Sequence, residues 1–304
     1  MKKLLKVLLL FAAIVIGIVI CAWLENNWIQ VSRYTVSSTK VPAGFNGFKI
    51  LQLTDLHSKS FGQDNQGLIS AINRIDPDII VITGDMLNSL NDEGEVFLSL
   101  ARELVSKYPI YYISGNHEQI AEVKAAESNS GWYTRYIAQL KQLGIVNLDN
   151  QRIQVRRGAD SINLYGLVLP LRYYSSKNAP HYAGEKRFSS EYIERCLGKV
   201  DNRGYNVLLV HTPFYFDTYS HWGADLVLAG HLHGGVIRIP FLGGVLSPDE
   251  GLFPAYDAGK YKNNMATMVV SRGLGDSVGW RIFNRPEVVV ITLERQSAKA
   301  TSGS

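Results

Sequence analysis

Five short stretches of this chain each end an apolar run with residues that can bind a metal ion. They are Asp55-Leu56-His57, Gly84-Asp85, Gly115-Asn116-His117-Glu118, His211-Thr212-Pro213 and Gly230-His231-Leu232-His233. Five of the seven histidines of the chain lie in these stretches. Mixed sets of oxygen and imidazole ligands suit Mn, Fe, Zn and related divalent ions. The pattern therefore predicts metal-dependent chemistry.

The number of candidate ligands predicts two ions rather than one. The candidates are Asp55, His57, Asp85, Asn116, His211, His231 and His233. Two ions about 3.5–4 Å apart can clamp a phosphoryl group and lower the pKa of a bound water. A metal-bound hydroxide would then attack phosphorus in line. His117, the histidine left over, is placed to protonate the leaving oxygen.

Each stretch taken alone also has a purely structural interpretation. Asp55 could cap a strand end, Asp85 and Asn116 could be turn residues, and His211 could be a core histidine. Five such coincidences in the same structural position favour a shared site.

The elements that would hold these stretches alternate between strands and helices in the first half. Apolar runs predict strands over 48–53, 78–83 and 108–114, and helical spacing predicts helices over 65–75, 92–107 and 132–143. The second half predicts strands over 152–156, 162–167, 207–210, 225–228, 265–271 and 288–293, with a helix over 189–197 and a loop over 213–223. This order predicts an α/β fold with two packed sheets. Because ligand sites in such sheets lie at the carboxyl ends of strands, all five stretches would meet at one edge.

The N-terminus has a different composition. Lys2, Lys3 and Lys6 precede about 18 uncharged residues over 7–24, which is close to the minimum for a membrane-spanning helix. A cleaved signal peptide is the alternative, but no A-x-A-like site precedes Asn26. We expect residues 1–27 to form a cytoplasmic basic start and an uncleaved transmembrane signal anchor. The protein would then be a single-pass protein of the cell membrane with its catalytic domain outside the cytoplasm.

The rest of the chain divides into three parts. Residues 28–47 are expected to be a linker and an edge strand, residues 48–295 the catalytic domain, and residues 296–304 a disordered tail. The net charge of the 304 residues is +4, without basic blocks, so no nucleic-acid partner is expected. The sequence does not predict an oligomeric state.

In this order the five stretches resemble the signature of the calcineurin-like metallophosphoesterase superfamily. The resemblance spans roughly residues 48–293, and residues 231–240, 251–253 and 271–275 make it closer to a membrane-associated bacterial branch. It implies an α/β/β/α sandwich, in which two packed mixed β-sheets are flanked by helices, with a binuclear metal centre. One ion would be bound by Asp55, His57, Asp85 and His233. The other would be bound by Asp85, Asn116, His211 and His231, with Asp85 bridging and His117 near the phosphate.

The resemblance implies a phosphodiesterase or phosphomonoesterase that needs two divalent ions. A membrane anchor would favour a phosphorylated substrate that is lipid-linked or part of the cell envelope. Two alternatives are a pyrophosphatase acting on a nucleotide-linked lipid precursor of the UDP-diacylglucosamine type and a non-catalytic metal-binding scaffold. A metal-dependent hydrolase of another bond is a third.

Three further features are candidates for contact with the substrate. Arg238 and Arg272 follow turns of the motifs and are predicted to contact its phosphate. The basic and aromatic loop over 171–186 would close over the substrate or remain solvated.

Overall fold

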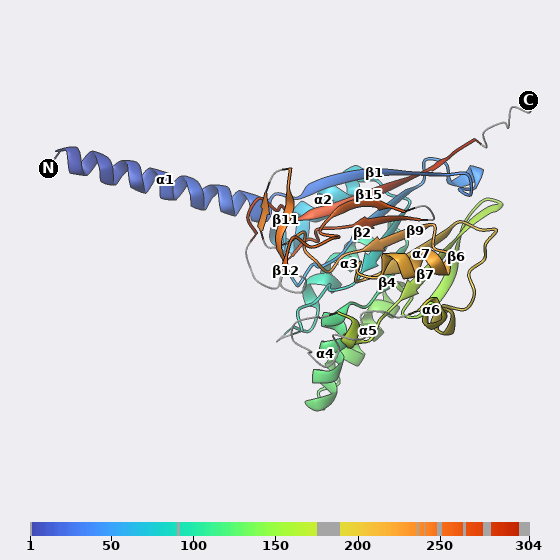
Figure 1. Ribbon diagram of the computed structural model, residues 1–304. Helices are drawn as coiled ribbons and strands as arrows, with labels where there is room; N and C mark the ends of the chain where they lie inside the picture. The colour runs from blue at the N-terminus through green and yellow to red at the C-terminus, as the bar shows by residue number, and fades with distance from the viewer. Residues whose placement is uncertain are drawn as a thin grey trace, which may run out of the picture.

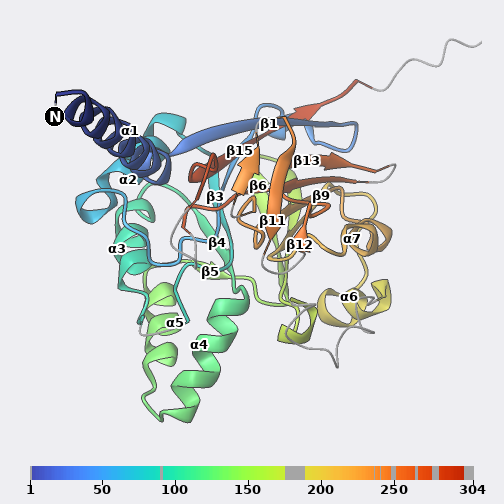
Figure 2. The same cartoon turned by 60° about the vertical axis from the view of Figure 1, so that its left-hand side comes forward.

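A long N-terminal helix leads into two β-sheets that pack face to face, with helices on both outer faces (Figures 1 and 2). The structure is a computed structural model that describes residues 2–89, 92–174, 189–235, 237–239, 241–247, 251–263, 266–275 and 281–297. Most of the loop predicted over 171–186, and residues 298–304 of the predicted tail, lie outside this part. The two mixed sheets and their flanking helices confirm the predicted sandwich.

The first sheet has six strands in the order β1-β15-β2-β3-β4-β5. Their bounds are β1 Gln30–Ser38, β15 Glu287–Arg295, β2 Lys49–Leu53, β3 Ile79–Thr83, β4 Ile110–Ile113 and β5 Val146–Asn147. β2, β3 and β4 run parallel, whereas β15 is antiparallel to β2. The carboxyl ends of β2, β3 and β4 therefore lie at one edge of the sheet.

The second sheet also has six strands, in the order β13-β14-β9-β8-β7-β6. Their bounds are β13 Gly259–Lys262, β14 Thr267–Val270, β9 Leu226–Ala229, β8 Asn206–Val210, β7 Asp160–Leu167 and β6 Gln151–Arg157. The four central strands are parallel and the two outer ones antiparallel to their neighbours. A third, small sheet consists of β10 (Ile237–Ile239), β11 (Gly243–Ser247) and β12 (Gly251–Leu252).

Seven α-helices complete the described part of the chain. They are α1 Lys2–Asn27, α2 Gln66–Ile75, α3 Glu95–Leu104, α4 Asn116–Glu127, α5 Trp132–Gln142, α6 Ser190–Leu197 and α7 Phe216–Trp222. α2, α3 and α5 pack on the first sheet, and α6 and α7 pack on the second. These helices cover the outer faces of the sandwich.

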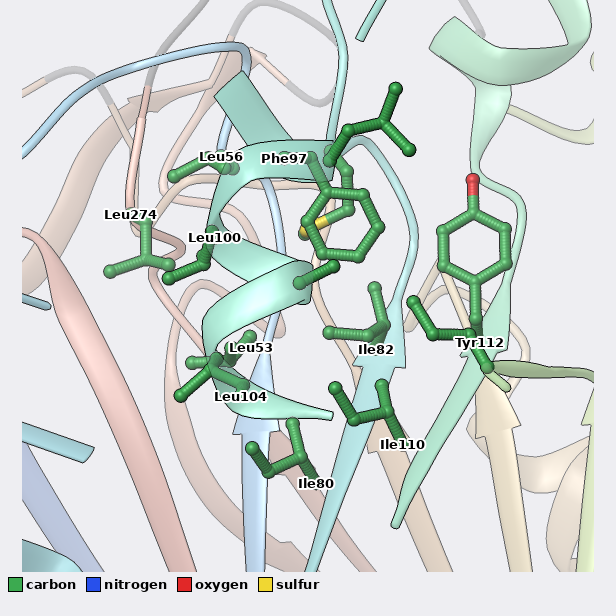
Figure 3. Packing of buried hydrophobic residues seen from close by; sticks show 14 of the residues in the cluster. Leu53, Leu56, Ile80, Ile82, Phe97, Leu100, Leu104, Ile110, Tyr112 and Leu274 are labelled. Carbon is green, nitrogen blue, oxygen red and sulfur yellow. The ribbon is translucent and has the colours of Figure 1, made fainter. Parts of the chain in front are cut away.

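Successive side chains of a strand point to opposite faces of the sheet, so each strand contributes to two layers of the core. In β3, Ile80 and Ile82 face the helices, whereas Ile79 and Val81 face the other sheet. Figure 3 shows the helix side, where Phe97, Leu100 and Leu104 of α3 pack against the first sheet. Every residue of β3 is buried, which explains why the sequence of this strand is almost entirely apolar rather than alternating.

The N-terminal helix differs from the prediction. The sequence predicted a membrane-spanning helix over residues 7–24, and α1 does cover these residues. Among the helices of the described part, however, none is both long and apolar enough to cross a membrane. The predicted transmembrane anchor is therefore not confirmed.

Two helices and the small sheet were not predicted. α4 buries only Glu118, Ala121 and Ala125, so its sequence lacks the apolar periodicity of a packed helix. α7 lies in a segment predicted as loop. The strands β10 to β12 have two to five residues each, too few for a pattern to establish.

Candidate metal centre

The five predicted stretches meet where the two sheets pack together. Each follows the carboxyl end of a strand: β2, β3, β4, β8 or β9. Gln52 of β2 crosses between the sheets, because its amide donates to the carbonyl oxygen of Ala229 at 2.9 Å and to the hydroxyl of Thr83 at 2.9 Å. The first sheet brings both carboxylates, His57, Asn116 and His117 to this seam, and the second sheet brings His211, His231 and His233.

Three overlapping groups of side chains at this seam could each hold a metal ion. They are Asp55, His57 and His233; His57, Asp85 and His117; and Asp85, His211 and His231. In each group one ligand atom per residue lies within 4.8 Å of the others.

The carboxylates of Asp55 and Asp85 each lie close to one histidine of either predicted metal site. Asp85 Oδ2 lies 3.0 Å from His211 Nε2 and 3.8 Å from His57 Nε2. Asp55 Oδ1 lies 3.8 Å from the Nε2 atoms of His211 and His233. His57 and Asp85 each occur in two of the three groups, and Asp85 is the carboxylate of the two that does so, as a bridging ligand would.

Backbone carbonyls fix which nitrogen of each histidine is available. The carbonyl oxygens of Thr83 and Gly275 lie 2.7 Å and 3.3 Å from Nδ1 of His211 and His233, respectively. Their Nε2 atoms therefore face the carboxylates. In His231, Nε2 is the atom that lies 3.3 Å from a carbonyl oxygen, that of Tyr174. Such contacts orient the rings of metal-binding histidines.

Two buried residues have polar atoms that a metal ion would satisfy. Both ring nitrogens of His57 and Oδ1 of Asn116 are buried without a hydrogen-bond partner in the described part of the chain. Buried polar atoms are nearly always paired, so these three need an explanation. The donor set fits divalent ions, and with Asn116 all seven predicted ligands lie at this seam.

Five of the seven predicted ligands have left-handed backbone conformations. Their φ angles are 52° for Asp55, 45° for His57, 56° for Asp85, 75° for His231 and 51° for His233. Such conformations cost about 1–3 kcal/mol each and are found mainly at functional sites. They let each chain turn back sharply, so that side chains from separate strands point into one place.

Glycines make room for these turns. A Cβ on Gly84, whose φ is 95°, would lie only 2.7 Å from the Cα of Gly115. A Cβ on Gly115 would in turn collide with the carboxylate of Asp85. The turns after β3 and β4 are therefore in direct backbone contact.

Glu118 holds these two turns together. One carboxylate oxygen accepts from the backbone N–H groups of Asp85 and Gly115, both at 2.8 Å. The other accepts from Met86 at 2.8 Å and Leu87 at 3.4 Å. Burial, followed by the charge of Asp85, raises the pKa of Glu118 to about 7. No role was predicted for this residue from the sequence, although a glutamate at the third position of a helix can accept from the backbone N–H of the N-cap residue, which here is Gly115.

His117 lies beside the ligands and is only partly buried. Its ring is edge-on to that of His57, with centroids 4.5 Å apart. Its Nδ1 accepts from the backbone N–H of Ser89 at 3.3 Å. In the neutral ring the proton is therefore on Nε2, which can donate a hydrogen bond.

Burial keeps two of the histidines neutral. Burial lowers the pKa of His57 to about 3 and that of His231 to about 4. Burial would also lower the pKa of His211, but the charge of Asp85 and a hydrogen bond to it raise this pKa to about 10. In the metal-free protein, His211 is therefore a protonated partner of Asp85.

The two predicted substrate contacts are already engaged within the protein. Arg238 donates to Asp257 and to the carbonyl oxygen of Gly234, both at 2.8 Å. Arg272 pairs with Glu287 at 3.0 Å and is 9% exposed. Neither arrangement tests a contact with phosphate, so both assignments stay predictions.

Comparison with known proteins identifies the family. The calcineurin-like phosphoesterase family matches residues 48–235, which contain all seven predicted ligands and His117. The chain belongs to this family. It is a metal-dependent phosphoric ester hydrolase, as the sequence predicted.

The similarity of this phosphoesterase to its relatives extends beyond residues 48–235. It is 29% identical over 280 residues to YkuE of Bacillus subtilis (strain 168), an uncharacterized metallophosphoesterase, covering 90% of this chain and 88% of that protein. It is 25% identical to an uncharacterized metallophosphoesterase of Aquifex aeolicus (strain VF5), covering 94% and 98%. Among solved structures it is similar to phosphopantetheinyl hydrolase of Mycobacterium tuberculosis (TM-score 0.44, 12% identity, covering 74% and 89%), which is too distant for an argument about function.

Replacing Glu118 by Gln should weaken metal binding. The amide would have to present its NH₂ group to one of the two pairs of backbone N–H donors, which weakens its hold on the turns at Asp85 and Gly115. Loss of a group that orients metal ligands typically costs about 10–100-fold in metal affinity. Titration of the metal-free variant with Mn or Zn measures this. Glu122→Gln, an exposed change on the same helix, is the control. Equal affinities in the two variants would contradict the role given to Glu118.

Metal binding should release a proton from His211. Its pKa of about 10 means that it is protonated at neutral pH, and only the neutral imidazole binds a metal. Between pH 6 and 8 the affinity should therefore rise with pH, by about tenfold per unit for each proton released. Calorimetry in buffers with different protonation enthalpies counts these protons. A pH-independent affinity with no proton release would show that this ion pair does not exist.

Proposed function

We propose that this protein hydrolyses phosphodiester or phosphomonoester bonds with two divalent ions. Asp55, His57 and His233 would hold one ion, Asn116, His211 and His231 the other, with Asp85 shared. The observation that carries this proposal is the set of overlapping ligand groups at one seam. When bound, the ions would polarise the phosphoryl group and lower the pKa of a water.

The residues around the ligands have separate tasks in this proposal. Glu118 and the glycine turns hold the carboxylates in place before the substrate arrives. His117 would act from the imidazolium form: it gives its Nε2 proton to the leaving oxygen and is left neutral with its remaining proton on Nδ1, so the contact with Ser89 is released in this step. The ring can then be reprotonated from solvent, because His117 is only partly buried.

We also propose that the protein works at the cell membrane, on a phosphorylated substrate that is lipid-linked or part of the envelope, with its catalytic domain outside the cytoplasm. The basic start at Lys2, Lys3 and Lys6 and the apolar residues over 7–24 support this location. Apolar side chains along α1, such as Phe11 and Ile14, are exposed. Exposed apolar surface of this kind is typical of segments that contact a membrane or a partner.

The purified full-length protein in detergent should contain two metal ions per chain and cleave a simple phosphodiester. We would measure metal content and the hydrolysis of bis(p-nitrophenyl) phosphate and p-nitrophenyl phosphate, with Mn and with chelator. Chelation should abolish turnover, and Mn should restore it. Tight binding of two ions without hydrolysis of either ester would point to a scaffold or to another bond. A protein that binds no metal would refute the proposal.

His117→Ala should keep both metal ions but lose most of the turnover. Removing a general acid typically lowers the rate by about 10²–10⁴-fold. The loss should be smaller for a substrate whose leaving group is a weak base, because such an oxygen leaves without a proton. His221→Ala, which changes an exposed histidine on α7, is the matched control. If His117→Ala lost metal instead, His117 would be a ligand, as the second of the three groups allows.

A further inference from the structure

Exposed apolar side chains gather on the end of the catalytic domain from which α1 projects. This apolar patch consists of Phe241, Leu242, Leu252, Phe253, Ile282 and Phe283. Each of the six is at least 42% exposed. In Figure 1, β11 and β12, which adjoin these residues, lie at the end of the sandwich from which α1 projects, and Figure 2 shows them facing the viewer and set apart from α1. Contiguous exposed apolar side chains mark surfaces that bind something.

Hydrogen bonds join the patch to the base of α1. The backbone N–H of Phe283 donates to the carboxylate of Glu25 at 2.7 Å. The backbone N–H of Arg281 donates to the side chain of Asn26 at 3.2 Å. On the other side, the N–H of Arg238 in β10 donates to the carbonyl oxygen of Ile282 at 3.0 Å. The helix base, residues 281–283 and the small sheet are therefore one connected surface.

The helix itself indicates what covers this surface. Leu8, Leu9, Leu10 and Phe11 are consecutive, and each is more than half exposed. Successive residues of a helix are 100° apart, so these four face all sides. A protein groove covers one side of a helix and leaves a polar stripe on the other. A lipid phase surrounds all sides and accounts for this pattern.

The boundary between α1 and the domain has the chemistry of a bilayer interface. Trp28 is 63% exposed, and the guanidinium of Arg285 lies 4.4 Å from the centre of its ring. Arg285 also donates to the carbonyl oxygen of Trp28 at 3.0 Å. Tryptophan and arginine, each with an apolar body and a polar end, are residues that lie at the headgroup level.

We propose that the apolar patch is a lipid-contact surface of the catalytic domain, which enters the same bilayer that receives α1. This inference rests on the membrane location proposed above and extends it from the N-terminal segment to the body of the enzyme. It gives the domain a fixed orientation, with the small sheet toward the lipid.

The patch is also connected to the metal centre. The side chain of Asn284, next to Phe283, donates to the carbonyl oxygens of His233 and Gly235 at 2.7 Å and 2.6 Å. The turn that carries two metal ligands is thus braced by the segment that carries the lipid-contact residues. A phosphate linked to a lipid anchor would be presented close to the ligands.

Fluorescent labels in the full-length protein can test this orientation. With Cys21 and Cys196 replaced by Ser, three variants would each carry an NBD label on one new cysteine: Phe241→Cys in the patch, Leu10→Cys in α1 and Val123→Cys on α4. Val123 is the matched control, because it is an apolar residue that is 51% exposed on another element. Each would be reconstituted in vesicles of phosphatidylcholine and phosphatidylglycerol, with or without doxyl-labelled lipid.

The labels at positions 241 and 10 should shift to shorter emission wavelengths and be quenched by doxyl lipid, whereas the label at position 123 should not. Quenching at position 10 but not at 241 would overturn the patch and leave the membrane location intact. A label at 241 that shifts without quenching would also overturn it, because protein would then cover the patch. No quenching at any position would refute the membrane location as well. None of these outcomes depends on hydrolysis.

Introducing negative charges into the apolar patch provides a second test. Phe253→Asp together with Phe283→Asp should reduce quenching of the label at position 241, because carboxylates resist transfer into hydrocarbon. Val123→Asp should leave that quenching unchanged. Circular dichroism would establish that both variants are folded. Equal quenching in the two would count against the inference.

Discussion

The metal centre depends on one buried carboxylate that accepts four backbone hydrogen bonds. Glu118 joins the turn after β3 to the turn after β4, and both turns carry predicted ligands. A buried charge is costly unless its oxygens are fully paired, and here backbone N–H groups pair them. Because those donors belong to two separate turns, the pairing is satisfied only when the turns are in register. The need to pair the buried carboxylate therefore fixes the position of Asp85 relative to Asn116.

The pairing of Glu118 with both turns fixes the ligands because the strands that lead into these turns cannot move independently. Ile80 and Ile82 are packed under the helices, while Ile79 and Val81 are packed against the second sheet, so β3 is held on both faces. Left-handed turns at the strand ends oppose folding, and isolated turns would relax. The apolar layers provide the stabilisation that keeps them strained. The ligands lie at the seam because only there do both sheets contribute strand ends.

Much of this arrangement could be predicted from the sequence, and what was missed has a physical cause. The strands before Asp85 and His211 are almost entirely apolar, and the strand before Asp55 has apolar residues on both sides of Gln52, so local pattern identifies all three well. The helix that begins at Asn116 is different, because it is fixed by the contacts of Glu118 with distant N–H groups rather than by an apolar face. The roles of the histidine nitrogens were equally hidden, since the carbonyls that set them come from residues such as Thr83 and Tyr174. The sequence pattern identifies which residues can be ligands, but only the tertiary structure shows which atom of each side chain faces the site.

The two halves of the centre differ in how they are held. The side chains of Asp85 and His211 are at most 2% exposed and lie between the sheets, whereas that of His233 is 14% exposed. His233 depends instead on Gly275 and on Asn284, which belongs to the segment at the base of α1. His233 therefore differs from Asp55 and His57, the other two unshared ligands predicted for its ion, which are buried in the core.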